Sequence, residues 1–153
     1  MLDRIDRKIL NLLQKDASLP LEEIASRVNL SKTPCWNRIK KLEKDGVIKR
    51  RVAILDPLKV DLGTTIFLML QAREHTAEWM ERFSETVAVM PQVVACYRMS
   101  GSIDYLIQIR VKDVAAYDRF YKRLIHMVPL ADVSSSFALE EMKFTTCLPL
   151  AED

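Results

Sequence analysis

Glycine and histidine are both scarce in this chain of 153 residues. Its three glycines, Gly46, Gly63 and Gly101, are too few and too far apart for a loop that cradles phosphate groups. Its two histidines, His75 and His126, lie outside any Cys/His cluster with the spacing of zinc ligands. No serine or cysteine has a candidate general base beside it in a recognisable catalytic motif. We therefore predict no metal, no cofactor and no catalytic residue, and we do not expect an enzyme.

Cysteines and long apolar runs are also few. Cys35, Cys96 and Cys147 are odd in number, widely spaced and set in apolar or helical contexts, which indicates reduced thiols rather than a disulfide framework. The first residues, Met1–Asp6, begin an amphipathic pattern and not the apolar run of a signal peptide. No stretch is long and apolar enough to cross a membrane. We expect a cytoplasmic protein with no membrane partner.

Charge is divided unevenly along the chain. The net charge is only +2, but residues 1–62 contain fourteen Lys or Arg against nine Asp or Glu, whereas residues 63–153 contain nine against twelve. Such a chain is not a general binder of polyanions, yet its positive charge is concentrated where a groove-binding module needs it. The length permits two small cores, and we place the boundary between them at Asp56–Gly63.

The chain does contain a pair of short helical patterns joined by a tight turn. After the first pattern, Asn29–Leu30 provides the turn, and Ser31 is placed to cap the second helix. Pro34 falls in the first turn of that helix, where its missing N–H costs nothing, and Gly46 is typical of the residue after a helix. The apolar positions with helical spacing are Leu21, Ile24, Ala25 and Val28 in the first pattern and Cys35, Ile39 and Leu42 in the second.

A third helical pattern precedes the pair, with Asp3 placed to cap it and Asp6 in its first turn. Three helices supply the core that a helix-turn-helix needs. The apolar segment Val47–Leu55, which ends at Asp56–Pro57, is predicted to be a strand, and we interpret it as a possible wing. Contact with phosphates and snorkelling at the surface are open alternatives for its basic residues, which are Lys49, Arg50 and Arg51.

The second helix of the pair has a cationic exposed face, which is typical of a helix that enters the DNA major groove. Its first-turn side chains are placed to face base edges, and later lysines to lie near phosphates. A solvated basic face on an ordinary helix is the alternative, and Trp36 has the alternative of packing on the preceding helix. The predicted DNA-binding residues are Lys32, Thr33, Trp36, Asn37, Arg38, Lys40 and Lys41, with Lys44 nearby.

The second half of the chain has a βαββαβ rhythm, which predicts a split-βαβ or ferredoxin-like sandwich. Four strands with alternating apolar residues supply more apolar surface than two helices can cover, so we expect the open sheet face to pair with another subunit. The predicted elements are strands at 64–72, 93–99 and 104–111, helices at 77–89 and 113–127, and an extended segment at 133–148. The inward residues predicted for the helices are Met80, Phe83 and Val87, then Val114, Tyr117, Tyr121, Leu124 and Val128.

The order and spacing of these features resemble the Lrp/AsnC family, the leucine-responsive or feast/famine regulators of bacteria and archaea. The resemblance runs from end to end. The residues that carry it are Leu2–Leu10, Leu30-Ser31, Arg38-Ile39, Leu42-Glu43, Gly46–Ile48, Gly101-Ser-Ile-Asp104-Tyr105, Ser135–Phe137 and Lys143–Pro149.

The resemblance implies an α+β protein in which a winged helix-turn-helix domain is joined to a βαββαβ ligand-sensing domain, often called RAM. On this basis residues 1–50 bind double-stranded DNA, 51–62 form a linker strand and hinge, and 63–153 sense a small amino-acid effector and assemble as homodimers and octamers. Carried over to this sequence, the effector-binding residues are Met99, Gly101, Asp104, Ser134 and Ser136.

The chemistry of these residues suits an amino acid. A turn at Gly101 exposes backbone N–H and C=O groups, Asp104 can meet an ammonium group, and the serine hydroxyls can meet a carboxylate. The alternative for Asp104 is a plain turn-capping role. Two departures from the family pattern leave the effector's identity open, namely Ser102-Ile103 after the glycine and Pro129–Asp132 without the usual glycine.

Three functional hypotheses follow. The favoured one is a sequence-specific transcriptional regulator whose DNA binding or assembly responds to a small amino acid. The second is an effector-independent architectural protein of the same fold that wraps DNA. The third is a metabolite-binding enzyme on the ferredoxin-like half, which the lack of a catalytic constellation opposes.

Overall fold

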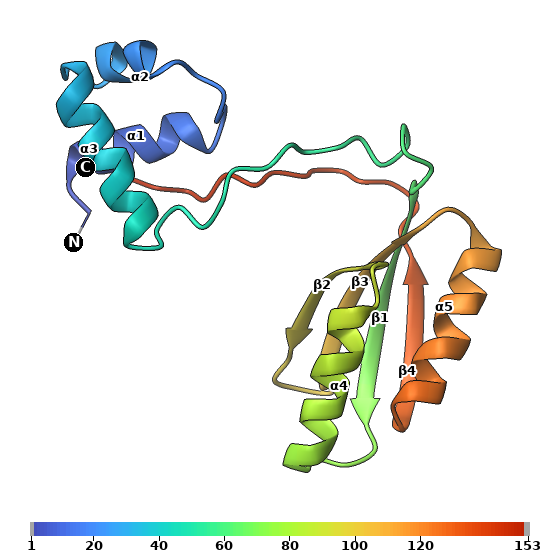
Figure 1. Cartoon of the computed structure of the whole chain (residues 1–153). Coiled ribbons are helices and arrows are strands. Elements are labelled where there is room, and N and C mark those ends of the chain that lie inside the picture. The colour runs from blue at the N-terminus through green and yellow to red at the C-terminus, as the bar shows by residue number, and fades with distance from the viewer. Residues whose placement is uncertain (1, 152–153) are drawn as a thin grey trace. The chain divides into compact units, whose positions relative to one another are not determined.

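The computed structural model describes residues 2–151, which form two units (Figure 1). One unit is helical and contains the chain through Ile54 together with the residues from Met142 onward, and the other is Leu55–Glu141. The α+β fold class predicted from the sequence is confirmed. Residues 142–151, which the predicted second domain of 63–153 includes, group with the helical unit in this division. Within residues 2–151, none of the helices is both long enough and apolar enough to cross a bilayer.

The helical unit contains α1 (Arg4–Leu13), α2 (Leu21–Arg27) and α3 (Lys32–Lys44). A capping box begins α1: Asp6 N–H donates to the Asp3 side chain, and Asp3 N–H donates to the Asp6 side chain. Ser31 occupies the N-cap position of α3 as predicted, but its side chain makes no capping hydrogen bond. Gly46 follows α3 with φ of 72°, a left-handed conformation that glycine adopts without a steric penalty.

The apolar faces of the three helices meet in one core, which includes every residue predicted to be buried on α3. Leu10 also belongs to this core, whereas Leu12 is only partly buried. The buried centre of this core includes Ile9, Ile24, Cys35, Ile39 and Leu42. This packing brings the N-terminal part of the chain together around α3 and leaves the opposite side of that helix exposed.

The C-terminal segment adds to the helical unit in a way that the sequence did not indicate. The Gln14 amide nitrogen donates to the Leu148 carbonyl at 2.9 Å, and Leu148 N–H donates to the Gln14 amide oxygen at 2.8 Å. Asn11 donates to the Leu150 carbonyl at 3.2 Å, and Leu150 packs against the core. One face of α1 therefore holds the end of the chain.

The strand predicted at 47–55 is wrong in this structure, because the described chain between α3 and Thr64 contains no strand. A strand needs a neighbouring strand for its backbone groups, and no strand within residues 2–151 pairs with this segment. Val52, Ile54 and Leu55 are exposed as a result. The apolar residues of this segment are therefore not buried by the cores of this chain.

The second unit contains a four-stranded antiparallel sheet in the order β2-β3-β1-β4, with α4 and α5 packed on it (Figure 1). The βαββαβ prediction is confirmed. The extended segment predicted at 133–148 begins earlier and is a strand only as far as Phe137; the chain beyond it is irregular. The elements are β1 (Thr64–Ala72), α4 (Ala77–Val89), β2 (Val93–Arg98), β3 (Tyr105–Val111), α5 (Val114–Met127) and β4 (Leu130–Phe137).

The inward faces of α4 and α5 are rotated from the predicted ones. On α4 the buried residues are Trp79, Phe83 and Thr86, whereas Met80 and Val87 are only partly buried. Trp79 stacks on Phe83 with ring centroids 5.1 Å apart, and its indole N–H donates to the Pro129 carbonyl at 2.7 Å. On α5 the buried residues include Phe120, which was not predicted, while Val114 is exposed and Tyr117 and Tyr121 are partly buried.

The other face of the sheet carries apolar residues that neither helix covers. Strand alternation puts Phe67 and Met69 of β1 opposite the buried side of that strand, and Met69 is paired with Leu106 of β3. Leu106 is in turn paired with Tyr97 of the edge strand β2, which is exposed. These four residues define what we call the open apolar face.

Candidate DNA-reading helix and effector turn

The residues predicted to read bases lie on the exposed side of α3. Thr33, Trp36 and Asn37 are all exposed, and none of them belongs to the core. Trp36 is 46 % exposed, so it does not pack away on α2 as the alternative supposed. The ammonium nitrogen of Lys40 lies 4.4 Å from the Trp36 ring centroid, a cation–π contact that holds the ring along the helix.

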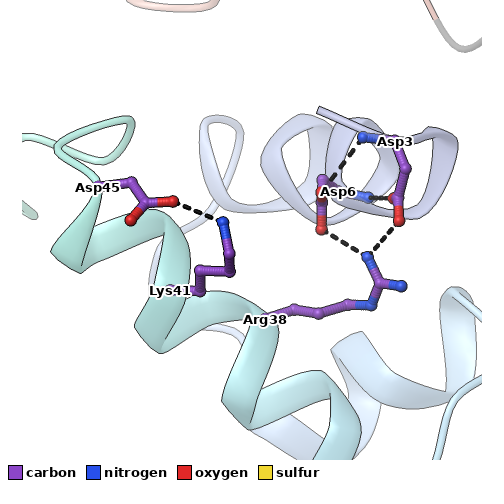
Figure 2. Close-up of polar contacts among 5 residues, drawn as sticks. All are labelled: Asp3, Asp6, Arg38, Lys41 and Asp45. Carbon is purple, nitrogen blue, oxygen red and sulfur yellow. Dashed lines mark hydrogen bonds and ion pairs between the residues drawn. The ribbon is translucent and has the colours of Figure 1, made fainter. Parts of the chain in front are cut away.

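Three of the predicted cations form ion pairs with nearby acids. Lys40 contacts Glu43 at 2.9 Å and Lys41 contacts Asp45 at 2.7 Å (Figure 2), while Lys32 pairs with Glu22 of α2. The hydrogen bond from Lys41 holds the pKa of Asp45 below its ordinary value and raises the pKa of Lys41. Because these pairs are largely exposed, they add little stability.

Arg38 is oriented differently from the other cations. Figure 2 shows its guanidinium turned toward the start of α1, where one nitrogen lies 2.5 Å from Asp3 Oδ2 and 2.8 Å from Asp6 Oδ1. The hydrogen bonds that the guanidinium donates to Asp3 and then to Asp6 raise the pKa of Arg38. The sequence grouped Arg38 with the DNA-binding residues, whereas in this structure its charge is engaged by two carboxylates.

The turn between β2 and β3 contains Gly101, whose φ of 134° is one that side-chain-bearing residues rarely adopt. A Cβ at this position would meet no atom within 4 Å, so the need for glycine arises from backbone conformation and not from crowding. Met99 N–H donates to the Asp104 carbonyl at 2.8 Å, which closes the turn. Met99 and Gly101 are both exposed.

Asp104 joins this turn to the end of β1. One carboxylate oxygen accepts from Ala72 N–H at 2.8 Å, and the backbone N–H of Asp104 donates to the Leu70 carbonyl at 2.9 Å. The other carboxylate oxygen lies 4.0 Å from His75 Nε2. Asp104 thus has the structural role considered as the alternative, while its second oxygen has no closer ion-pair partner among the described residues.

Ser134 and Ser136 are exposed on the edge strand β4, opposite Met69 and Phe67 of β1. The turn with Gly101 follows β2, at the other edge of the sheet, with β3 and β1 between. The structure therefore does not gather the five predicted effector residues into one pocket within this chain. Sequence reasoning also missed Gln71, whose side chain donates to the Ser102 carbonyl at 2.8 Å and steadies the turn.

Two family models match this chain. Residues 65–148 match the Lrp/AsnC ligand binding domain, and residues 2–49 match a winged helix-turn-helix DNA-binding domain. The first match covers the sheet unit with the Gly101 turn, and the second covers the three helices.

Relatives and solved structures agree with these matches. The chain is 51 % identical over 151 residues to the DNA-binding transcriptional activator DecR of Escherichia coli K12, covering 98 % of this chain and 99 % of the relative. It is 46 % identical to a glutamate uptake regulatory protein of Zymomonas mobilis, covering 99 % and 92 %. A crystal structure of an AsnC family transcriptional regulator from Agrobacterium tumefaciens superposes with a TM-score of 0.94 at 54 % identity, covering 97 % of each chain.

A second solved structure contains an amino acid. It is a transcriptional regulator of Neisseria meningitidis in complex with L-Met, with a TM-score of 0.93 and 37 % identity, covering 98 % of this chain and 97 % of that one. The helix-turn-helix, the ligand-binding sheet unit and the end-to-end similarity to known regulators together place this chain in the Lrp/AsnC family of transcriptional regulators.

Proposed function

We propose that this regulator binds a free amino acid at the Gly101–Asp104 turn and that binding changes its affinity for DNA or its assembly. The observation that carries the proposal is the arrangement of Asp104. One oxygen accepts from Ala72 N–H, so the carboxylate is held in place, while the other lies 4.0 Å from His75 Nε2 on a side chain that is 31 % exposed. A fixed carboxylate beside an exposed, glycine-containing turn suits an ammonium group.

The predicted effector-binding residues lie at opposite edges of the sheet, which supports a binding site formed by residues of two copies of this chain. Ser134 and Ser136 lie at the opposite sheet edge from the turn, so one chain cannot offer both to the same small molecule. We propose that the open apolar face pairs two chains into a dimer, and that dimers meet where a turn of one chain faces the serines of another. The L-Met complex of the Neisseria relative supports an amino acid as the ligand.

On the DNA side, we propose that Thr33, Asn37 and Trp36 contact bases and that Lys32, Lys40 and Lys41 contact phosphates. The exposure of these side chains and their separation from the core support this assignment. A regulator of this kind acts where the chromosome is, in the bacterial cytoplasm, and two recognition helices in a dimer would read a pseudo-palindromic site.

The decisive experiment is isothermal titration of the full chain with cysteine, leucine, methionine, glutamate and alanine, followed by Asp104→Asn with whichever binds. Asn keeps an acceptor for Ala72 N–H but loses the charge, so we expect the variant to stay folded and to lose ligand affinity at least tenfold. Asp113→Asn, at the N-cap of α5, is the matched control and should bind normally.

Two results would contradict the proposal. Wild-type affinity in Asp104→Asn would mean that the site lies elsewhere. If none of these five amino acids binds at millimolar concentration, and a thermal-shift screen of all twenty raises the melting temperature with none, the architectural alternative takes its place, because a ligand that binds only the folded state must stabilise it.

A further inference from the structure

The carboxylates of Asp3 and Asp6 each perform two tasks at the start of α1. Asp3 Oδ1 accepts from Asp6 N–H at 2.8 Å, and Asp6 Oδ2 accepts from Asp3 N–H at 3.2 Å, which forms the capping box. The remaining oxygens, Asp3 Oδ2 and Asp6 Oδ1, accept from the guanidinium of Arg38 (Figure 2). All four carboxylate oxygens are therefore used, and the cap of one helix is also the receptor for a side chain of another.

Arg38 lies at an informative place on α3. It follows Asn37, which is exposed, and precedes Ile39, which is buried in the core. Core packing by Ile39 is non-directional and tolerates small rotations of a helix, whereas a guanidinium held by two carboxylates has a defined geometry. The contact therefore constrains the rotation and lateral position of α3 on α1.

Burial and charge distinguish this contact from the other ion pairs of α3. The Asp6 side chain is 16 % exposed and that of Arg38 is 32 % exposed, whereas Lys41 and Asp45 are 76 % and 46 % exposed. Hydrogen bonds from Asp6 N–H and then from Arg38 lower the pKa of Asp3, and the hydrogen bonds that Arg38 donates to Asp3 and then to Asp6 raise the pKa of Arg38. The contact therefore favours the charged forms of Asp3 and Arg38.

From this geometry we propose that Arg38 is a positioning residue for sequence reading, and that Asp3, Asp6 and Arg38 form a clasp which sets the orientation of α3 on α1. The proposal rests on the DNA-reading role of α3 proposed above. Arg38 then acts on bases through Asn37 and Thr33, which it aligns, and makes no phosphate contact of its own. Asp3 and Asp6, although acidic and near DNA, favour specific binding.

A positioning role and a purely electrostatic role predict opposite changes in affinity for the preferred DNA sequence when one of the acids is removed. If the only effect of the acids is to keep Arg38 from contacting phosphate, neutralising one of them increases affinity for all DNA, because the net charge near the DNA backbone becomes more positive. If the clasp positions α3, removing an acid lowers affinity for the preferred sequence while affinity for other DNA stays the same or rises slightly. The ratio of the two affinities therefore separates the explanations.

The test uses the full chain and two probes: a duplex that the wild type selects from a randomised pool, and the same duplex with its bases scrambled. Binding is measured by fluorescence anisotropy at several salt concentrations for Asp6→Asn and Arg38→Gln. The matched control is Asp45→Asn, which removes an acid that pairs with a lysine of α3 outside the clasp (Figure 2). Asn at position 6 keeps an acceptor for Asp3 N–H, so the cap of α1 is preserved.

We expect Asp6→Asn and Arg38→Gln each to lower the selected-to-scrambled affinity ratio by about tenfold, comparable to loss of one good base contact. The salt dependence of Arg38→Gln should match that of the wild type, whereas a lost phosphate contact reduces the slope by about one unit. Asp45→Asn should raise both affinities slightly and leave their ratio unchanged. Where Asp6→Asn proves unfolded by circular dichroism, Arg38→Lys replaces it, because it keeps the charge but replaces the planar guanidinium, one nitrogen of which bridges the two acids, with a compact ammonium group on a different stem.

Two outcomes would overturn the proposal. One is a rise in affinity for both duplexes in Asp6→Asn together with a salt slope reduced by one in Arg38→Gln, which would make Arg38 a phosphate contact. The other is an unchanged affinity ratio in every folded clasp variant, Arg38→Lys included, which would make the clasp a stabilising contact only.

Discussion

Neighbouring residues of α3 have unlike roles because the helix turns each side chain to a different surface. Asn37 faces solvent, Arg38 faces the acids of α1, and Ile39 faces the core. Three consecutive residues thus provide a candidate base contact, a candidate positioning contact and a buried contact. Charge alone does not distinguish Arg38 from the lysines of the same helix. Its contacts with Asp3 and Asp6, which are distant in sequence, do distinguish it.

Base-reading and phosphate-contacting residues should respond differently to substitution. Asn37→Ala should weaken binding to the selected duplex by about 1–3 kcal/mol and relax the preference at one base position. Lys40→Gln should weaken binding to selected and scrambled DNA about equally and reduce the salt slope by about one unit. Titrations at several salt concentrations measure both effects. Equal losses on both duplexes for Asn37→Ala would refute its base-reading role.

The pKa of Asp3 predicts a contribution to stability in acid. The pKa of its carboxyl lies below the ordinary value of 3.8, because the folded state favours the charged form through Asp6 N–H and Arg38. A depressed pKa gives stability that is complete above the unfolded value and is lost as the pH falls through the folded value. We expect the difference in unfolding free energy between wild type and Asp3→Asn to be largest at neutral pH and to shrink below about pH 4.

Urea unfolding of both proteins between pH 7 and pH 2 measures this difference. Other acids with lowered pKa values, such as Asp16 and Asp45, are common to both proteins and cancel in the comparison. A difference that grows as the pH falls would contradict the assignment.

Elements in this chain depend on partners far away in sequence. α1 is held on one side by α3 through the clasp, and it also binds the C-terminal segment through Gln14 and Asn11. α4 is anchored by the Trp79 indole on the Pro129 carbonyl, which immediately precedes β4. The Trp79 contact orients α4 through a partner distant in sequence, which periodicity alone does not reveal.

Docking of the C-terminal segment should depend on Gln14. Gln14→Ala removes two hydrogen bonds to the Leu148 backbone, at 2.9 and 2.8 Å, and should reduce the stability of the helical unit by about 1–2 kcal/mol. The amide of Leu148 should lose its protection in hydrogen exchange measured by NMR, since that N–H donates to the Gln14 side chain. Lys15→Ala, at an exposed neighbouring position, is the control; equal exchange of Leu148 in both variants would argue against the contact.

For the whole molecule, the proposed assembly rests on a surface that one chain leaves uncovered. The open apolar face lies across three strands, and a soluble dimer would bury it. Leu106→Glu puts a charge at the centre of that face without entering the core, and should convert the full-length protein to monomers at micromolar concentration. Multi-angle light scattering measures this, with the exposed α5 variant Val114→Glu as control. A wild-type protein that is monomeric under these conditions would exclude the proposed interface.

Local signals in the sequence determined the helices, their caps and the order of the strands. Helix-end signals involve only residues close together in sequence, so they can be recognised before the fold is known. Examples are Asp3 with Asp6, Gly46 after α3 and Asp113 before α5. The βαββαβ order is likewise a matter of alternating periodicities. The family resemblance came from the same local motifs, and the comparisons confirmed it.

Only the tertiary structure decided which partners distant residues obtain. It brought Arg38 to Asp3 and Asp6, Asp104 to Ala72, and the C-terminal segment to Gln14. It also left the segment predicted as a strand at 47–55 without a pairing partner. Hydrogen bonds and ion pairs act over a few ångströms in space, and they leave no periodic pattern in the sequence. Sequence patterns therefore show that a residue is charged or apolar but do not identify its contact partners.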